Sequence, residues 1–371
     1  MNIFDRYILV QQIKPFAFFS FVLVGILWLI QALPRLDDVI SNGQSALVFL
    51  DIAILILPQV MLLVLPIAAF ASTLYAIHKL IIESELIIFM NAGLSSVKLI
   101  RPVIIFGGLV CIFLFYLSIH LVPVSQHNLR NKIFEIRQEF SNRLIKDQQF
   151  FHPVKGVTIY IREASDVGEI KGIFITDARE GKQTVTYSAK EAIMSRTPEG
   201  LILVMQNGLL QVADPPQSSL TTLKFNRMGF ELNDFLPTGP RKNIAPVEIP
   251  PLKILQNPNR YGSENSYNNN DYISEAHIKL AAPLGALALT LLALCAFLIS
   301  GFNKRGYFNT IILAILGAVF VQSLTSAFRT TVVNDITLFW ILYTPSIICI
   351  ITSIFLIIIS INFNRYNLKI K

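Results

Sequence analysis

The chain has 371 residues, of which 53% are hydrophobic and only 15% are charged. Soluble domains have about a quarter of their residues charged, so this composition excludes a soluble globular protein and indicates an integral membrane protein. The formal net charge is +7. Because the basic residues are scattered and gather mainly beside apolar runs, they indicate the positive-inside pattern, and we expect no nucleic-acid partner.

Three apolar runs in residues 1–122 are long enough to cross a bilayer. No small-residue cleavage site follows the first run, Phe16 to Leu33, so we expect an uncleaved span and not a signal peptide. The second run, Phe49 to Ile77, is longer than a bilayer requires and contains two prolines that should kink it. The third span is predicted from Pro102 to Leu121.

The loop between the second and third spans, His78 to Arg101, carries much apolar surface for a connection. Its spacing predicts an amphipathic helix at about residues 79–97, with the acidic residues Glu83 and Glu85 on its polar face and Gly93 at its end. A helix lying flat on the membrane is the alternative, but anionic head groups would repel two neighbouring carboxylates. We therefore predict a coupling helix for a cytosolic partner, with Glu83, Ser84, Glu85, Leu86, Met90 and Gly93 as its contact residues.

The chain changes character twice after the third span. Residues 123–149 keep a helical period of apolar positions, which predicts a helical extension into the aqueous compartment. Residues 150–236 contain short alternating segments separated by Gly, Asp, Asn and Pro turns, which predicts an all-β domain of jelly-roll or sandwich type. Residues 237–275 are mostly polar, so we expect a linker without a core of its own.

Alternation in the first β segment separates an apolar face from a polar one. Val157, Ile159 and Ile161 point one way, while Thr158 and Tyr160 point the other way. We expect Ile159 and Ile161 to line an interior that is open enough to admit acyl chains.

Three more spans are predicted in residues 276–371: Ile278 to Ile299, Phe308 to Ala327 and Leu338 to Ile361. Basic residues in the short loops place both termini in the cytoplasm and the β domain outside it. The expected fold is therefore an α-helical polytopic membrane protein with six transmembrane helices and a periplasmic all-β domain inserted between helices 3 and 4.

The sequence lacks a Walker A loop, a GxSxG elbow, an HExxH pair and a dinucleotide GxGxxG. The five histidines are dispersed, and the three cysteines, Cys111, Cys295 and Cys349, lie in apolar runs. We expect no metal site, no disulfide, no cofactor and no enzyme activity. The energy source should therefore lie on another chain.

Several segments together resemble the YjgP/YjgQ permeases, the LptF and LptG subunits of the lipopolysaccharide exporter. They are the opening RYILVQQIKPF, the loop IIESELIIFMNAGLS, the β segments, the fourth span EAHIKLAAPLGALAL and the 3 + 3 layout. The likeness covers essentially the whole chain, and the opening residues favour the LptF type. The chain departs from the family's fourth-span pattern at Ile278 and Lys279, where arginine or a neighbouring aromatic residue is usual.

The resemblance implies a heterodimer with a paralogous LptG-type permease and a dimeric cytosolic ABC ATPase. Such an assembly takes lipopolysaccharide from the outer leaflet of the inner membrane of a Gram-negative bacterium and passes it to periplasmic bridge proteins. The resemblance also implies that Glu83 and Glu85 would sit in a groove of the ATPase.

Two arginines at the predicted periplasmic span ends become candidates for the lipid's phosphates. Arg35 is the better one, because guanidinium pairs with phosphate bidentately, and Arg329 is the weaker one. Asp37 and Asp38 could instead pair with Arg35 and make it an anchor. The i,i+4 pair Glu275 and Lys279 is explained equally well as an interfacial anchor.

Two other classes of function compete with a transporter subunit. A lipid-modifying enzyme would need ionisable residues converging near the spans, and these spans are almost free of charge. A transmembrane scaffold that transmits ATPase state to a periplasmic partner would share the coupling loop but would need no lipid-sized cavity.

Overall fold

The protein is described by a computed structural model that covers residues 3–41, 45–91, 97–143, 150–152, 156–164, 169–179, 184–197, 200–214, 219–231, 241, 243–262, 267–300 and 307–369. The chain divides into two compact units. The helical unit comprises Met1–Leu129 and Asn243–Lys371, and the β unit comprises Arg130–Lys242.

Six helices among the described residues are long and apolar enough to cross a membrane. The expectation of six spans is therefore confirmed. Their candidate bounds are Ile3–Arg35, Ala46–Ile82, Ile100–Ile136, Asn269–Ser300, Phe308–Asn334 and Ile336–Ile359.

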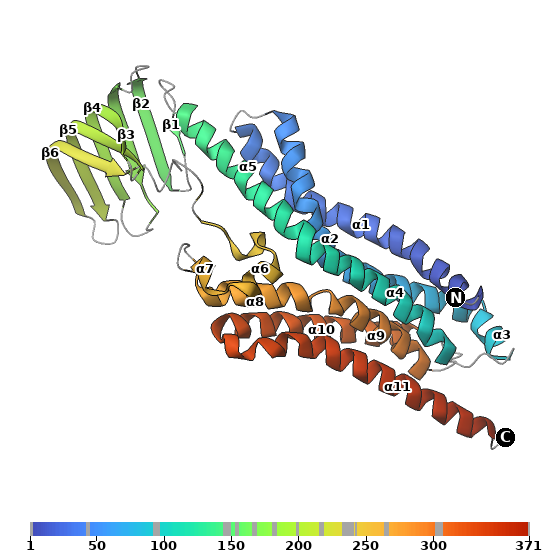
Figure 1. The fold of residues 1–371 in the computed structure, drawn as a ribbon. Coiled ribbons are helices and arrows are strands. Elements are labelled where there is room, and N and C mark those ends of the chain that lie inside the picture. The colour runs from blue at the N-terminus through green and yellow to red at the C-terminus, as the bar shows by residue number, and fades with distance from the viewer. Residues whose placement is uncertain are drawn as a thin grey trace. The chain divides into compact units, whose positions relative to one another are not determined.

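The first two spans form a helical hairpin from α1 (Ile3–Ser41) and α2 (Ala46–Ile82). The indole Nε1 of Trp28 donates to the Ala53 carbonyl at 2.7 Å and ties the two helices together. The third span is one helical path of α4 (Val97–Tyr116), the π-helical turn η1 (Leu117–Leu121) and α5 (Val122–Arg143), as Figure 1 shows.

The second half of the helical unit begins with short elements: η3 (Pro246–Glu248), α6 (Pro251–Gln256) and α7 (Asn259–Gly262). The fourth span is divided into α8 (Asn269–Ala281) and α9 (Leu284–Ser300), because Pro283 has no N–H to continue the helix. The remaining elements are α10 (Phe308–Asn334), η4 (Ile336–Tyr343) and α11 (Thr344–Lys369).

The described part of the expected polar linker has a core of its own, which corrects the interpretation of residues 237–275. Ile249, Ile254 and Tyr272 are 6%, 0% and 0% exposed and form one apolar cluster with Ala276. Apolar residues are few in this stretch, but Tyr272 and Ala276 lie one helical turn apart on α8, so they share the face that the isoleucines cover. The composition therefore understated the order of this segment.

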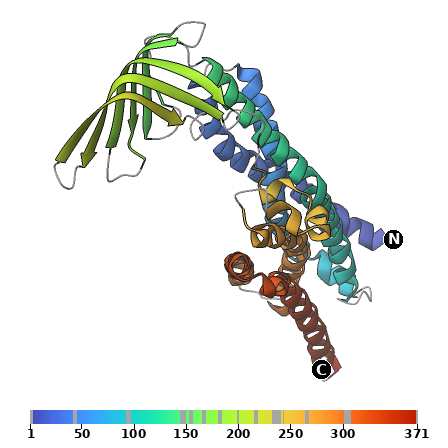
Figure 2. The same cartoon turned by 60° about the vertical axis from the view of Figure 1, so that its left-hand side comes forward.

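The β unit contains one antiparallel sheet whose six described strands lie side by side in chain order. The all-β domain expected between the third and fourth spans is thus present. A jelly roll or sandwich would divide its strands between two sheets, whereas these strands form a single meander that is strongly curved (Figure 2). The strands are β1 (Phe150–Phe151), β2 (Val157–Ala164), β3 (Glu169–Asp177), β4 (Thr184–Thr197), β5 (Gly200–Asp214) and β6 (Ser219–Glu231).

A crease across β2 to β6 explains how one sheet makes its own core. Each of these strands has two neighbouring residues at the crease that are polar, except for Gly172, and exposed, except for Gly172 and Gln206. Regular alternation would leave only one outward-facing residue between two buried ones. Gly172 and Asn207, with φ of 71° and 52°, reverse the alternation in β3 and β5. The paired row is Glu163, Lys171, Glu191, Gln206 and Arg227. The residues next to it, which the register pairs skip, are Arg162, Gly172, Lys190, Asn207 and Asn226.

Buried rows on both sides of this crease meet in one apolar cluster. Ile161, Ile173 and Ala189 come from one side of the crease. Ile170, Ala192 and Met205 come from the other side. The bend therefore brings two parts of the same sheet face together, and a second sheet is not needed to cover them.

Helix α9 lies at the centre of the helical unit, where it packs against α2, α4, α10 and α11. It approaches α4 closely at Gly107, where an added Cβ would overlap Thr290 Oγ1 and meet Leu287 Cδ1 at 3.0 Å. Small residues at such crossings let two membrane helices approach closely. The neighbouring Gly108 has open space where a Cβ would be.

These two glycines give a matched test of the crossing. Gly107→Ala should lower the free energy of unfolding by about 1 to 3 kcal/mol relative to Gly108→Ala, because both variants gain helix propensity but only the first overpacks the contact. Chemical unfolding in detergent measures the difference. Equal stabilities would show that α4 and α9 are not in close contact at Gly107.

Candidate functional site

The predicted coupling region is not one helix. Helix α2 ends at Ile82, and a turn at Glu83 and Ser84 separates it from the short helix α3 (Glu85–Asn91). Ser84 has a φ of 58°, a left-handed conformation that prevents the two helices from being continuous. Residues 92–96, which include Gly93, lie outside the described part, as does the side chain of Met90.

Glu85 contacts another helix of its own chain. The Tyr7 hydroxyl on α1 lies 2.9 and 2.7 Å from the two Glu85 carboxylate oxygens, and Gln11 Nε2 donates to that hydroxyl at 3.1 Å. Phe89 of α3 adds an edge-on contact to Phe4, with ring centroids 5.0 Å apart. These contacts hold α3 against the first turns of α1.

Glu83 differs from Glu85 because its carboxylate faces outward. Its side chain is 46% exposed, and the Lys79 ammonium lies 3.9 Å away, too far for a strong bond. Ile82 and Ile88 nearby are 64% and 63% exposed. Leu86, by contrast, is buried in the helical core. The surface formed by Ile82, Glu83 and Ile88, called the α3 surface below, thus combines an exposed carboxylate, which Lys79 approaches to 3.9 Å, with apolar side chains.

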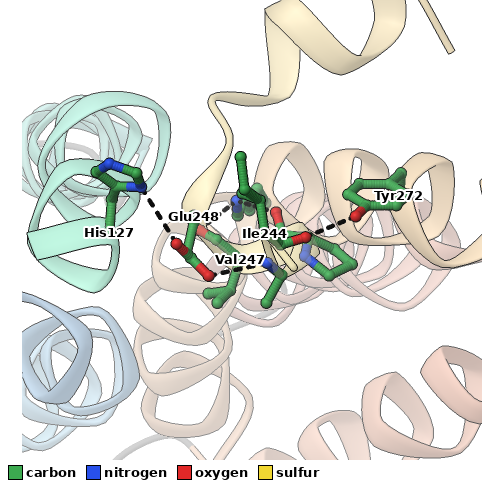
Figure 3. A network of polar contacts seen from close by, with 8 residues as sticks. His127, Ile244, Val247, Glu248 and Tyr272 are labelled. Atoms are coloured by element: carbon green, nitrogen blue, oxygen red, sulfur yellow. Dashed lines mark hydrogen bonds and ion pairs between the residues drawn. The ribbon is translucent and has the colours of Figure 1, made fainter. Parts of the chain in front are cut away.

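A second group of polar contacts lies where the chain returns from the β unit. The segment Asn243 to Pro250 is called the return segment. Its backbone carbonyls accept hydrogen bonds from side chains of α8. Tyr272 Oη donates to the Ile244 carbonyl at 2.6 Å (Figure 3). Lys279 Nζ donates to the carbonyls of Pro246, Val247 and Ile249 at 3.1, 2.8 and 2.8 Å.

Glu248 in the middle of the return segment bonds in two directions. Its Oε1 accepts the Ala245 backbone N–H at 2.8 Å, and its Oε2 lies 3.2 Å from Nδ1 of His127 on α5 (Figure 3). The Glu248 side chain is fully buried, while that of His127 is 45% exposed. The carboxylate therefore joins the return segment to the helix that leads into the β unit.

The break in the fourth span is stabilised from the third span. In a regular helix the Lys279 carbonyl would accept from residue 283, but that residue is proline. The Ser118 hydroxyl in the π-helical turn donates to this carbonyl at 2.7 Å instead. Single π turns often occur at functional positions. The sequence left the role of Lys279 open. Pro283, four residues after it, was the sequence signal for a helix break that leaves the Lys279 carbonyl without its helical donor.

The two arginines expected to bind lipid lie on different helices. Arg35 is half-buried near the end of α1, and Arg329 is exposed near the end of α10. The views show α1 and α10 on different sides of the helices α4 and α9 (Figure 1). The structure describes no side chain between residues 36 and 44, so the expected pairing with Asp37 and Asp38 lies outside the described part.

Ile159 and Ile161 are 4% and 6% exposed in the apolar cluster of the β unit, together with the predicted face partner Val157. Tyr187 packs at the margin of this cluster, and burial raises the pKa of its phenol. Thr158 and Tyr160, expected on the other face, are partly exposed. The face assignment from alternation therefore agrees with the burial.

Within the described residues, no group of three or more histidine, cysteine or acidic side chains could hold a metal ion. Cys111, Cys295 and Cys349 are buried free thiols.

Comparison with known proteins identifies the family of this chain. An uncharacterized protein of Rickettsia prowazekii (strain Madrid E) is 23% identical over 326 residues, which cover 87% of this chain and 89% of that protein. The family model described as "Lipopolysaccharide export system permease LptF/LptG" matches residues 6–359. Because that match covers nearly the whole chain, both units included, the chain belongs to the LptF/LptG family of lipopolysaccharide export permeases.

Proposed function

We propose that this chain is a permease subunit of an ABC-type lipopolysaccharide exporter in the inner membrane of a Gram-negative bacterium. It extracts the lipid from the outer leaflet and passes it through its β unit to a periplasmic bridge, and a separate cytosolic ATPase dimer drives the transfer. The family match over residues 6–359 is the observation that carries this proposal. The opening residues favour the LptF type, which would pair with an LptG-type subunit.

The α3 surface supports the proposed docking of an ATPase. A carboxylate between two exposed isoleucines suits a groove with a basic residue and apolar walls, the usual chemistry of a small protein interface. Of the two glutamates predicted to dock, Glu83 fits this role better, because Tyr7 already occupies the Glu85 carboxylate. Glu85 would then hold α3 on α1, so that movement of α3 reaches the first span.

Basic residues support the proposed orientation. Arg6, Lys14, Lys79, Lys98 and Arg101 flank the spans at the same side as α3, and the positive-inside rule places that side in the cytoplasm. The β unit, inserted between the third and fourth spans, would then be periplasmic. The apolar cluster of its creased sheet has the chemistry that acyl chains require, and the sheet would open to expose it to them.

Purification of the complex provides the first test. The full-length chain should copurify with a cytosolic ATPase and with bound lipopolysaccharide. Copurification with the ATPase and a periplasmic protein but no lipid would favour a transmembrane scaffold instead.

Charge reversal tests the α3 surface. Glu83→Lys should weaken ATPase association by about 2 to 5 kcal/mol, because it removes a charge-assisted contact and leaves a basic partner facing a like charge. Glu135→Lys, an exposed position on α5, is the matched control. Copurification measured against ATPase concentration gives the affinities, and parental binding by Glu83→Lys would eliminate the docking role.

Lipid passage through the β unit can be detected with photo-crosslinkers. Probes at Ile159 and Ile161 should capture lipopolysaccharide during ATP-driven transport, because both side chains lie on the apolar face. Probes at Thr158 and Tyr160 are the controls on the opposite face. Capture only at the control positions would reverse the assigned faces.

Recognition of the phosphorylated head group can be tested at Arg35. Arg35→Lys should weaken lipopolysaccharide binding, because an ammonium cannot make the bidentate contact of a guanidinium, while membrane insertion and basal ATP hydrolysis persist. Arg329→Lys should have a smaller effect. Unchanged lipid binding in Arg35→Ala would show that this arginine does not touch the head group.

A further inference from the structure

The return segment is held by one face of α8. Tyr272 and Lys279 are seven residues apart, which places them two turns apart on the same side of that helix. Between them they donate to the carbonyls of Ile244, Pro246, Val247 and Ile249. These contacts recognise the backbone of the return segment, so they depend on its conformation more than on its side chains.

Lys279 is not a lysine that reaches toward a membrane surface. It is 3% exposed, and its three N–H groups bond three carbonyls. An ammonium has three donors and no acceptor, so its bonding capacity is used. A buried ammonium is very costly without partners, and each buried carbonyl left without a donor adds a smaller cost. The lysine and the return segment therefore depend on each other.

The same segment is also joined to α5. The Glu248 carboxylate meets His127 at 3.2 Å, and the chain leaves the helical unit two residues later, at Leu129. It re-enters at Asn243, five residues before Glu248. The two chain connections to the β unit are thus bonded to each other inside the helical unit, as Figure 3 shows for His127 and Glu248.

We infer that Lys279 is a positioning residue that fastens the return segment to α8, and that the contact between His127 and Glu248 ties this segment to α5. The two connections to the β unit then keep a constant spacing and move as one body when the fourth span moves. This joint needs no ligand and goes beyond the proposed export function.

Hydrogen exchange of the full-length protein tests the lysine. In Lys279→Met the amides of Ala245, Glu248 and Ile249 should exchange at least about tenfold faster, because the methionine keeps the apolar stem but offers no donor to the carbonyls. Exchange within α9 should not change. The control is Lys253→Met, at an exposed lysine on α6. Unchanged exchange of the return segment in Lys279→Met would overturn the role of Lys279.

A second measurement remains informative if Lys279→Met fails to fold. Spin labels on the exposed Asn128 and Asn243 report the spacing of the two connections. We expect one narrow distance distribution in the parental protein, with and without nucleotide in the assembled complex. His127→Phe, which alters a partly exposed ring, should broaden it. A distribution unaffected by His127→Phe, or one that shifts between nucleotide states in the parental protein, would overturn the joint.

Lipid transfer in the assembled exporter adds a readout that rests on the proposed function. His127→Phe should lower the lipid released per ATP hydrolysed while ATP hydrolysis persists, and an unchanged ratio would overturn a role of the joint in transport. If the parental complex moves no lipid, the export function fails, but the distance and exchange measurements still decide the joint.

Discussion

The break in the fourth span at Pro283 is the constraint on which the arrangement of the helical unit depends. Inside a membrane a backbone carbonyl without a partner costs several kcal/mol, so the carbonyl freed at Lys279 requires a donor from a neighbouring helix. Ser118 supplies it from the π-helical turn, and this bond holds the third and fourth spans in register. The Lys279 side chain is then directed to the return segment, so one residue connects a helix break to the path of the chain outside it.

Both ends of the helical unit use the same physical device, a polar side chain of one helix that bonds a segment from elsewhere in the chain. At the α3 end the segment is a short helix, held through the carboxylate of Glu85 by Tyr7. At the other end it is an irregular stretch, held through its carbonyls by Lys279 and Tyr272. In each case an element too short to be stable alone is ordered by a long membrane helix.

The spans and strands could be predicted from the sequence because their signals are local. Apolar length reveals a span, and the alternation of Val157, Ile159 and Ile161 reveals a buried face before any partner is known. The contact between Tyr7 and Glu85 joins residues 78 positions apart, and no periodic pattern in the sequence predicts it. The return segment was predicted to be a linker because its few isoleucines become a core only when Tyr272 covers them. The crease did leave a local signal, two neighbouring residues in each strand from Arg162–Glu163 to Asn226–Arg227 that are polar except for Gly172, but it is recognisable only when the strands are aligned.

The crease also limits which sequence changes the β unit can accept in evolution. Its outward-facing pairs differ in chemistry from strand to strand, so apart from Gly172 and Asn207, whose positive φ restricts them, the identity of a residue there matters little. Their number matters, because two positions in each strand must fall between the buried rows. Loss of one residue from β4 at Lys190 or Glu191 would move every residue beyond it by one cross-strand row, out of register with its partners in β3 and β5. The β unit should therefore tolerate exchanges along this line and reject insertions and deletions, the reverse of what is usual in loops.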